Sequence, residues 1–194
     1  MEKNHTVLLI SGSIRKESYT RSLTEYIART FENKGISAYH WNLLEKPLPI
    51  MIPELRDDSA NHPDENVRTF ADLALSCDAT VLSSPIYHNS FSGVLKNALD
   101  HLRNPHFAYK PMGLVSHGGD GSKQAVDQLR IVGRGVNAIV TPTIICTSED
   151  DFEGFELTSD SIKKRVDRFC DELMLFTETF RSIRAEQQKM IKDK

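Results

Sequence analysis

The apolar residues of the chain alternate between short β-prone runs and longer stretches of helical periodicity. The first run, residues 6–10, is continuously apolar after its opening threonine. Such a run is typical of a parallel strand, because other elements cover both of its faces. Four further runs predict strands at residues 36–41, 79–82, 112–116 and 138–145.

Apolar residues that recur every three or four positions predict five helices between and after these runs. In the first helix, Ser22 and Glu25 fit a capping box and Gly35 gives the stop signal. The others are predicted over residues 64–76, 94–102, 124–132 and from about 158. Strands that alternate with helices predict an α/β fold with a parallel sheet, right-handed crossovers and helices on both faces.

Ligands of such folds bind beyond the carboxyl ends of the strands, where the strand order reverses. Three loops lie at these ends in the predicted order of elements: residues 11–20, 84–92 and 116–121. We therefore look for chemistry in these three loops.

The first loop, residues 11–20, joins a buried strand to the start of a helix. It offers backbone N–H groups, several hydroxyl groups and the guanidinium of Arg15. These groups suit a phosphate dianion at the positive end of a helix; the alternative is a serine-rich turn with an N-cap. Neither a Walker A sequence nor a G-x-G-x-x-G fingerprint is present, which disfavours a permanently bound Rossmann-type NAD.

The second loop, residues 84–92, combines the rigid backbone of Pro85 with aromatic side chains and polar groups. A flat heterocycle is bound by such a mixture, through stacking on its face and hydrogen bonds at its edge. The alternative is that Tyr87 and Phe91 cover the core while Ser92 caps the next helix. The third loop carries Gly118-Gly119-Asp120-Gly121, which by itself predicts only a tight turn.

Two segments have more apolar residues than a single sheet can cover. The irregular stretch 42–63 contains four prolines and a group of apolar side chains: Leu48, Ile50, Met51, Ile52 and Leu55. The last helix carries a heptad-like stripe of Ile162, Val166, Phe169, Leu173, Phe176, Phe180 and Ile183. We predict that they form subunit contacts in a homodimer or homotetramer, unless both fold back on their own chain.

Composition narrows the class of protein. A chain of 194 residues with 39% apolar and 26% charged residues predicts one globular domain over 1–194, with a charged tail from about 184. A net charge of −3 gives no reason to expect a nucleic-acid partner. No apolar run approaches the roughly 20 residues that span a bilayer, and no secretory signal is recognisable, so we expect a cytoplasmic protein.

The sequence predicts no metal site. The three cysteines are widely spaced, and no pair of histidines among His88, His101, His106 and His117 has the spacing of a helical metal motif. His88 and His117 are candidates for the substrate side of a bound cofactor, although a solvated or capping role suits each of them as well. A G-x-S-x-G nucleophile elbow is absent, which disfavours an α/β-hydrolase.

Two motifs resemble a known family. G-S-I-R-K-E-S at residues 12–18 and P-I-Y-H-N-S-F-S-G-V-L-K-N-A-L-D at residues 85–100 are similar to the signatures of the NADPH-dependent FMN reductases, which include azo, quinone and chromate reductases. The resemblance covers roughly residues 6–145. It implies a flavodoxin-like three-layer sandwich with five parallel strands in the order 2-1-3-4-5.

The resemblance also implies the site residues. The FMN phosphate would be held by Ser13, Arg15, Ser18 and Thr20. The isoalloxazine edge would meet the main chain of Pro85, Ile86, Tyr87 and His88, and the ring would be approached by Ser116, Gly118 and Gly119.

The function implied is an FMN-dependent NAD(P)H oxidoreductase. NADPH or NADH, as a transient co-substrate, would deliver hydride to the flavin, and a small-molecule acceptor such as free flavin, a quinone or an azo compound would receive the electrons. Because the cofactor carries the chemistry, we assign no side chain as acid, base or nucleophile. A flavodoxin-type electron carrier and a flavin-dependent enzyme of a biosynthetic pathway remain the alternatives.

Overall fold

Five parallel strands form the central sheet, as the apolar runs predicted. In the computed structural model, which describes residues 5–192, they are β1 (Thr6–Ser11), β2 (Ser37–Asn42), β3 (Ala79–Tyr87), β5 (Pro111–His117) and β6 (Ile139–Thr147). Their order in the sheet is β2-β1-β3-β5-β6, with every neighbouring pair parallel. The predicted order 2-1-3-4-5 is confirmed, since β5 and β6 are its fourth and fifth strands.

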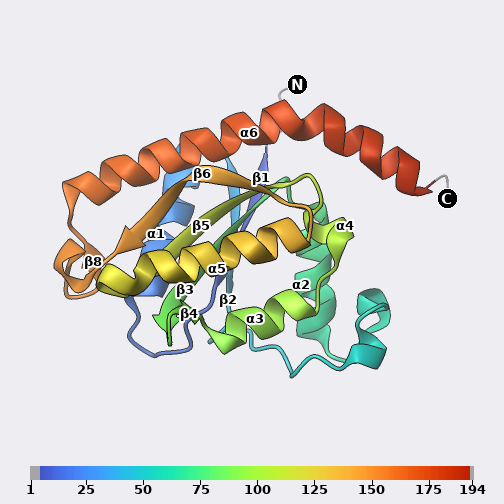
Figure 1. Ribbon diagram of the computed structural model, residues 1–194, viewed down its shortest axis with the longest axis horizontal. Coiled ribbons are helices and arrows are strands. Elements are labelled where there is room, and N and C mark those ends of the chain that lie inside the picture. The colour runs from blue at the N-terminus through green and yellow to red at the C-terminus, as the bar shows by residue number, and fades with distance from the viewer. Residues whose placement is uncertain (1–4, 193–194) are drawn as a thin grey trace.

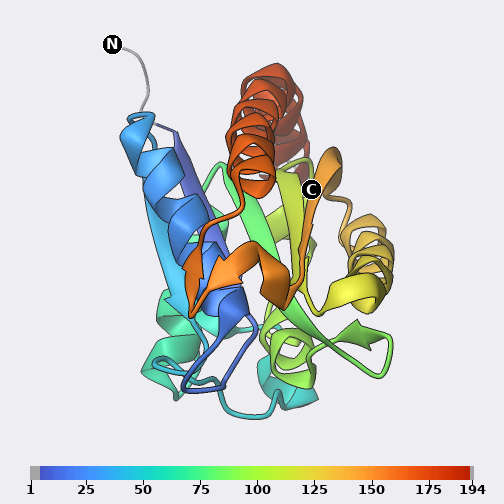
Figure 2. The ribbon, with the colours of Figure 1, turned by 90° about the vertical axis from the view of Figure 1, so that its left-hand side faces the viewer.

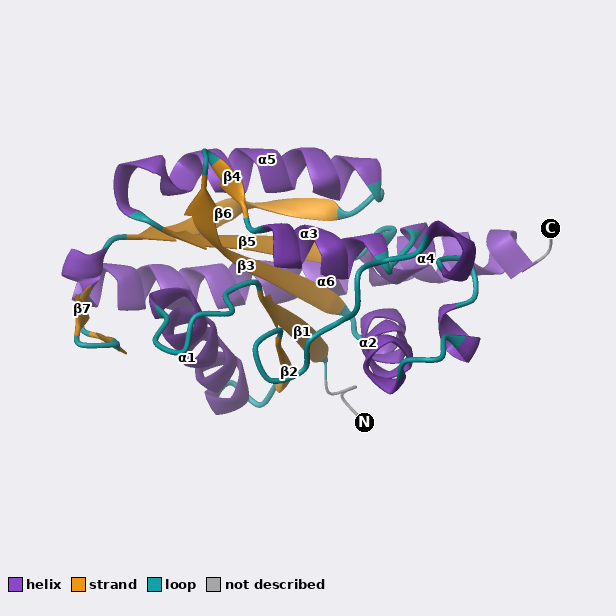
Figure 3. Ribbon diagram, turned by 90° about the horizontal axis from the view of Figure 1, so that it is seen from below, coloured by secondary structure: helices purple, strands orange, loops and turns teal. Residues whose placement is uncertain are grey.

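Helices cover both faces of this sheet (Figures 1 and 2). One layer is formed by α1 (Tyr19–Asn33) and α6 (Asp160–Lys192), and the other by α2 (Glu65–Ser76), α3 (Gly93–Asp100) and α5 (Ser122–Gly135). In the view of Figure 3, α3 passes in front of the strands and α6 behind them.

The side chains of β1 pack into two hydrophobic cores, one on each face of the sheet. Val7 and Leu9 pack with Leu23 of α1 in one cluster, whereas Leu8 and Ile10 pack with the helices of the opposite face. All of these side chains are fully buried. Successive residues of a strand point to opposite faces, so a continuously apolar strand requires helices on both.

The predicted start of α1 is wrong. The helix begins one turn earlier, at Tyr19, and its N-cap is Ser18, whose hydroxyl accepts a hydrogen bond from the backbone N–H of Arg21. Ser22 and Glu25 lie inside the helix and form no capping box. Lys34 and Gly35 end the helix as expected, with Gly35 in the left-handed region at a φ of +77°.

Short elements that the sequence did not predict fill the connections. They are β4 (Ser90–Phe91), which pairs with β3, the helix α4 (Asn104–Phe107), and the hairpin of β7 (Phe152–Glu153) and β8 (Glu156–Leu157). The hairpin leads from β6 into α6. It lies at the end of the sheet where the three candidate loops also lie.

The segment 42–63 is irregular, as predicted, apart from two 3₁₀ turns at Pro53–Leu55 and Ser59–Asn61. It is bound to α3 through Asn97, which accepts from the N–H of Met51 at 2.9 Å and donates to the carbonyl of Pro49 at 2.8 Å. The Nε2 of His101 lies 2.9 Å from the same carbonyl. These contacts fold the segment back on its own chain, yet Ile50 stays 79% exposed and Ile52 50% exposed.

The helix α6 covers the sheet with its first half. Val166, Phe169 and Leu173 are buried there, whereas Ile183 is 40% exposed. The predicted tail from about 184 continues this helix to Lys192, beyond the sheet (Figure 1). Arg184 fixes the helix by donating to the carboxylate and the carbonyl of Asp78, both at 3.1 Å.

Within residues 5–192, no helix is long and apolar enough to cross a membrane. The same residues contain no group of three His, Cys, Asp or Glu side chains placed to hold a metal ion. Of the three free cysteines, Cys77 and Cys170 are buried and Cys146 is half-buried.

Candidate functional site

A cavity of about 360 Å³ opens at the carboxyl ends of the strands. The three candidate loops all line it, together with a fourth that follows β6. Its walls are formed by Ser13, Arg15, Glu17, Ser18, Tyr19, Thr20, Pro85, Ile86, Tyr87, His117, Gly118, Glu149 and Phe155.

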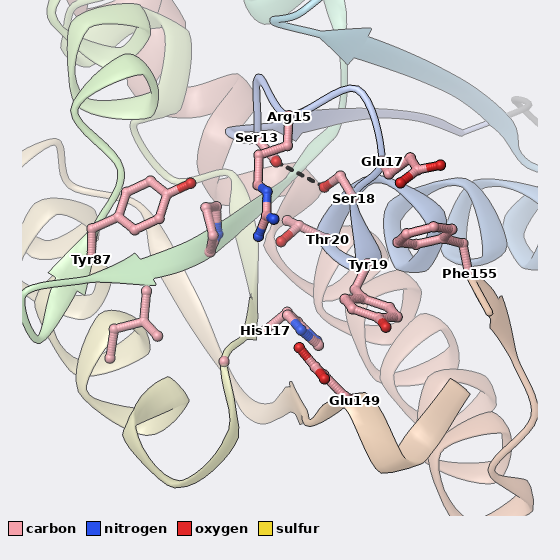
Figure 4. A pocket seen from close by; sticks show the side chains of 13 residues that line it. Ser13, Arg15, Glu17, Ser18, Tyr19, Thr20, Tyr87, His117, Glu149 and Phe155 are labelled. Carbon is pink, nitrogen blue, oxygen red and sulfur yellow. Dashed lines mark hydrogen bonds between the residues drawn. The ribbon is translucent and has the colours of Figure 1, made fainter. Parts of the chain in front are cut away.

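Hydroxyl groups and the start of α1 form one end of the cavity. Ser13, Ser18 and Thr20 are buried, and the hydroxyl of Ser18 donates to that of Ser13 at 2.8 Å (Figure 4). The N–H groups of a first helical turn have no partner within the helix, and Ser18 accepts one of them, that of Arg21. The remaining positive end of the helix dipole faces a pocket of hydroxyls, which suits an anion.

The guanidinium of Arg15 adds a positive charge to this end of the cavity. Arg15 is exposed and points into the cavity, between Tyr87 on one side and Thr20 on the other (Figure 4). The loop that carries it is fixed from α1, because the guanidinium of Arg21 donates to the carbonyl of Arg15 at 2.7 Å and also to that of Lys16.

The first and second loops are hydrogen-bonded to each other. Gly12 donates its N–H to the carbonyl of Ser83 at 2.8 Å and accepts at its own carbonyl from the hydroxyl of Ser92 at 2.6 Å. The N–H of Ser92 in turn donates to the hydroxyl of Ser84 at 2.9 Å. A Cβ on Gly12 would lie 2.8 Å from that of Leu95, so only glycine allows this approach. Ser92 also caps α3, the role that the alternative interpretation of the second loop gave it.

The second loop forms the opposite end of the cavity with an extension of β3. Pro85, Ile86 and Tyr87 belong to this strand and line the cavity. The chain then turns at His88 and Asn89, whose φ angles of 49° and 61° are those of a two-residue hairpin turn. His88 is exposed at the tip of this turn and does not line the cavity.

The third loop meets the second through Gly118. This residue has a φ of +148°, and a Cβ on it would lie 2.2 Å from the Cγ2 of Ile86. Gly118 lines the cavity, whereas Ser116 and Gly119, which were predicted with it, do not. Ser116 is fully buried, and its hydroxyl has no hydrogen-bond partner in the part of the chain that the structure describes.

Glu149 and Phe155 are the site residues that the sequence did not indicate. They come from the connection between β6 and α6, in which Phe155 sits at the tip of the β7–β8 hairpin. The rule that placed ligands beyond the carboxyl ends of strands applied equally to the strand predicted at 138–145. The sequence therefore indicated that the connection after this strand could also line the site, although it is not one of the three candidate loops.

An aromatic cluster fixes this fourth wall to α1. The ring of Tyr19 lies 4.7 Å from that of His117, 5.0 Å from that of Phe152 and 4.9 Å from that of Phe155, centroid to centroid. Burial, above all, lowers the pKa of His117, and the charge of Arg15 lowers it further, while Glu149 and Asp151 act in the opposite direction. The lowered pKa favours the neutral form of the His117 ring.

Known proteins match both the sequence and the fold. The family model of NADPH-dependent FMN reductase matches residues 5–152. An FMN-dependent NADPH-azoreductase of Staphylococcus aureus is 33% identical over 175 residues, which cover 87% of this chain and 93% of the relative.

Solved structures share the architecture. FerB, a flavoenzyme NAD(P)H:(acceptor) oxidoreductase from Paracoccus denitrificans, superposes with a TM-score of 0.74 at 22% identity and covers 91% of this chain and 98% of its own. A flavodoxin from the domain Archaea gives a TM-score of 0.60 at 10% identity, over 89% and 98% of the two chains. These likenesses confirm the flavodoxin-like fold. By the extent of the family match and the identity to the azoreductase, the chain belongs to the NADPH-dependent FMN reductase family.

Proposed function

We propose that the cavity holds FMN and that the protein uses it to pass electrons from a nicotinamide dinucleotide to a small-molecule acceptor. Membership of the family makes the chain an FMN-dependent NAD(P)H oxidoreductase. The observation that supports this placement of FMN is a single cavity whose two ends differ in chemistry. Hydroxyl groups and Arg15 line the end at the start of α1, which we call the cradle, and residues of β3 and the third loop line the other end.

The residues at the cradle fit a phosphate. Ser13, Ser18 and Thr20 offer hydroxyl donors, α1 offers N–H groups, and Arg15 offers a charge-assisted contact. No carboxylate lies among these four side chains, although Glu17 borders them at the rim. We propose these four residues as the phosphate ligands.

The residues at the other end fit a flat ring. Pro85, Ile86 and Gly118 line the cavity, and the lack of a side chain on Gly118 lets the third loop approach Ile86 closely. Tyr87 is 47% exposed and adds an aromatic face. We propose that the backbone of Pro85 to Tyr87 and of Gly118 meets the isoalloxazine, whereas His88, Ser116 and Gly119 do not line the cavity.

Bound FMN supplies the two-electron chemistry, accepting hydride from NADPH or NADH and passing it to the acceptor. The chain positions the ring, excludes water from its buried side and neutralises the phosphate. The family match and the azoreductase relative favour this reductase over the alternative of an electron carrier. We propose an azo compound, a quinone or free flavin as the acceptor, and the cytoplasm as the place of action.

The Arg15→Ala variant tests the phosphate end. Loss of one charge-assisted hydrogen bond is expected to weaken FMN binding about 10- to 150-fold, or about 1.5–3 kcal/mol, and to leave riboflavin binding unchanged. Titration calorimetry of the apoprotein with FMN and with riboflavin measures both. Lys16→Ala, which removes the neighbouring exposed cation outside the cavity, is the matched control. Equal affinity of the parent for FMN and riboflavin would show that the cradle is not a phosphate site.

We also propose that the protein is a homodimer or homotetramer. The support is apolar surface on two segments, with Ile50 and Ile52 exposed beside α3 and Leu175 and Ile183 exposed on α6. Light scattering at low micromolar concentration is expected to give a multiple of the 21.9 kDa chain mass, and Ile50→Asp or Ile183→Asp is expected to lower it. A monomer mass for the parent would refute the proposal.

A further inference from the structure

His117 is the residue of the cavity whose role the proposed function leaves open. It ends β5 and is held on three sides: Tyr19 stacks on its ring at 4.7 Å, Phe152 meets the ring edge-on at 5.7 Å, and its Nδ1 lies 3.1 Å from the hydroxyl of Thr147. Thr147 is itself buried. A ring held in this way has one orientation, because stacking and a fixed hydrogen bond together define it.

The remaining ring nitrogen is free for a ligand. Among the described residues, no hydrogen bond to the Nε2 of His117 is present, and the residue lines the cavity on the wall below Thr20 (Figure 4). If the hydroxyl of Thr147 donates to Nδ1, the neutral ring carries its proton on Nε2. In either tautomer, Nε2 is the ring nitrogen of His117 that is available to contact a bound molecule.

The position of His117 favours the phosphate end of that molecule. Tyr19, on which it stacks, is the first residue of α1, directly after the N-cap Ser18 and directly before Thr20. Arg15 is one of the charged groups that act on the pKa of His117, and burial and the carboxylates of Glu149 and Asp151 act on it more strongly. The imidazole therefore lines the same cavity as the helix terminus and the guanidinium, and it contacts the first residue of α1.

We propose that His117 is a proton-linked ligand of the FMN phosphate. This inference rests on the proposed function: when the phosphate dianion enters the cradle, the imidazole takes one proton from solvent and, as imidazolium, contacts the phosphate together with Arg15. The proton ends on a ring nitrogen, one N–H bond is formed, and nothing is oxidised or reduced.

The charges around the ring explain why the proton arrives with the ligand. Arg15 of the first loop opposes protonation, Glu149 and Asp151 of the connection after β6 favour it, and Tyr19, Phe152 and Thr147 are uncharged neighbours. Burial is the largest influence and lowers the pKa, which favours the neutral ring before binding. A dianion at hydrogen-bond distance reverses this balance, because an opposite charge favours the charged form of its neighbour.

Calorimetry of FMN binding in two buffers of different ionisation enthalpy, between pH 6 and 8, counts the protons taken up. The parent is expected to take up as much as about one proton near pH 7 with FMN and none with riboflavin, which has no phosphate. His117→Gln is expected to take up none with either ligand. Because both proteins bind the same phosphate, whose second pKa is about 6, their difference isolates His117. Loss of the contact is expected to weaken FMN binding by about 10-fold at pH 6.

A second variant keeps the test open if His117→Gln fails to fold. Glu149 is exposed, so Glu149→Gln is expected to fold and to move the proton-uptake profile to lower pH, since it removes a carboxylate that favours the imidazolium. Equal proton uptake by the parent and His117→Gln, or an unmoved profile in Glu149→Gln, would overturn the inference while FMN binding itself stands. A parent that does not bind FMN, or binds riboflavin equally well, would overturn the proposed function and this inference with it.

Discussion

The Gly118→Ala variant is expected to lose FMN affinity by about 30-fold or more. A Cβ at this position would lie 2.2 Å from the Cγ2 of Ile86, and the φ of +148° is strained for any residue other than glycine. Overpacking and backbone strain each cost about 1–3 kcal/mol. The third loop must therefore move away from β3, which opens the wall that we assign to the flavin ring. Fluorescence titration of the apoprotein with FMN measures the loss.

Gly119→Ala is the matched control for this result. Gly119 also has a positive φ, +69°, but no atom lies within 4 Å of the Cβ that alanine would add. We expect a cost of about 1 kcal/mol in stability from the backbone alone, and FMN affinity within a few-fold of the parent. Similar FMN affinity in the Gly118→Ala variant and its control would contradict the placement of the ring against Ile86.

Replacing Lys110 by methionine is expected to lower the free energy of unfolding by about 2–4 kcal/mol. Lys110 is 1% exposed, and its Nζ donates to the carbonyls of Ala74 at 2.6 Å and Leu75 at 2.7 Å. These carbonyls end α2 and have no further helical turn to pair with. Methionine fills a similar volume but removes the donor from both carbonyls, of which that of Ala74 is buried. Urea unfolding compares the parent with this variant and with Lys164→Met, whose lysine is exposed.

The same residue predicts a dependence of stability on pH. Burial, and then the charge of Arg184, lower the pKa of Lys110 to about 7, against an unfolded value of about 10.4. The unfolded chain therefore binds more protons between these values, and the stability of the folded state rises with pH through that window. A neutral amine retains two N–H donors for the two carbonyls, so their hydrogen bonds persist. The stability advantage of the parent over Lys110→Met is expected to grow from pH 7 to 9, and a constant difference would contradict the lowered pKa.

The strands and their order followed from the sequence because burial on both faces leaves a simple pattern. Residues 6–10 show it most clearly, since helices on both sides exclude polar residues. The start of α1 did not follow, because its first turn carries Thr20, which lines the cavity, and Arg21, which binds the preceding loop, rather than the apolar residues of a covered face. Apolar periodicity begins only at Leu23, which misplaced the cap by one turn.

Site residues that lie close together in one loop could be predicted from the sequence. Site residues that meet only through the fold were harder to predict. Ser13, Arg15 and Ser18 lie within six residues, and the structure gathers them around one helix terminus. Glu149 and Phe155 reach the cavity from the connection after β6, in which Phe155 packs on Tyr19 of α1. Lys110 has its partners 35 and 36 residues away, at the end of α2, and no local pattern marks such a contact.

The most direct test of the whole account is an anaerobic stopped-flow measurement on the purified holoprotein. Mixing with NADPH or NADH is expected to bleach the flavin absorbance at a rate that saturates with nucleotide, and a subsequent azo dye or quinone is expected to restore it. This result would establish hydride transfer from a nicotinamide to FMN held by this chain. A protein that retains FMN but bleaches with neither nucleotide would contradict the reductase and leave an electron carrier in its place.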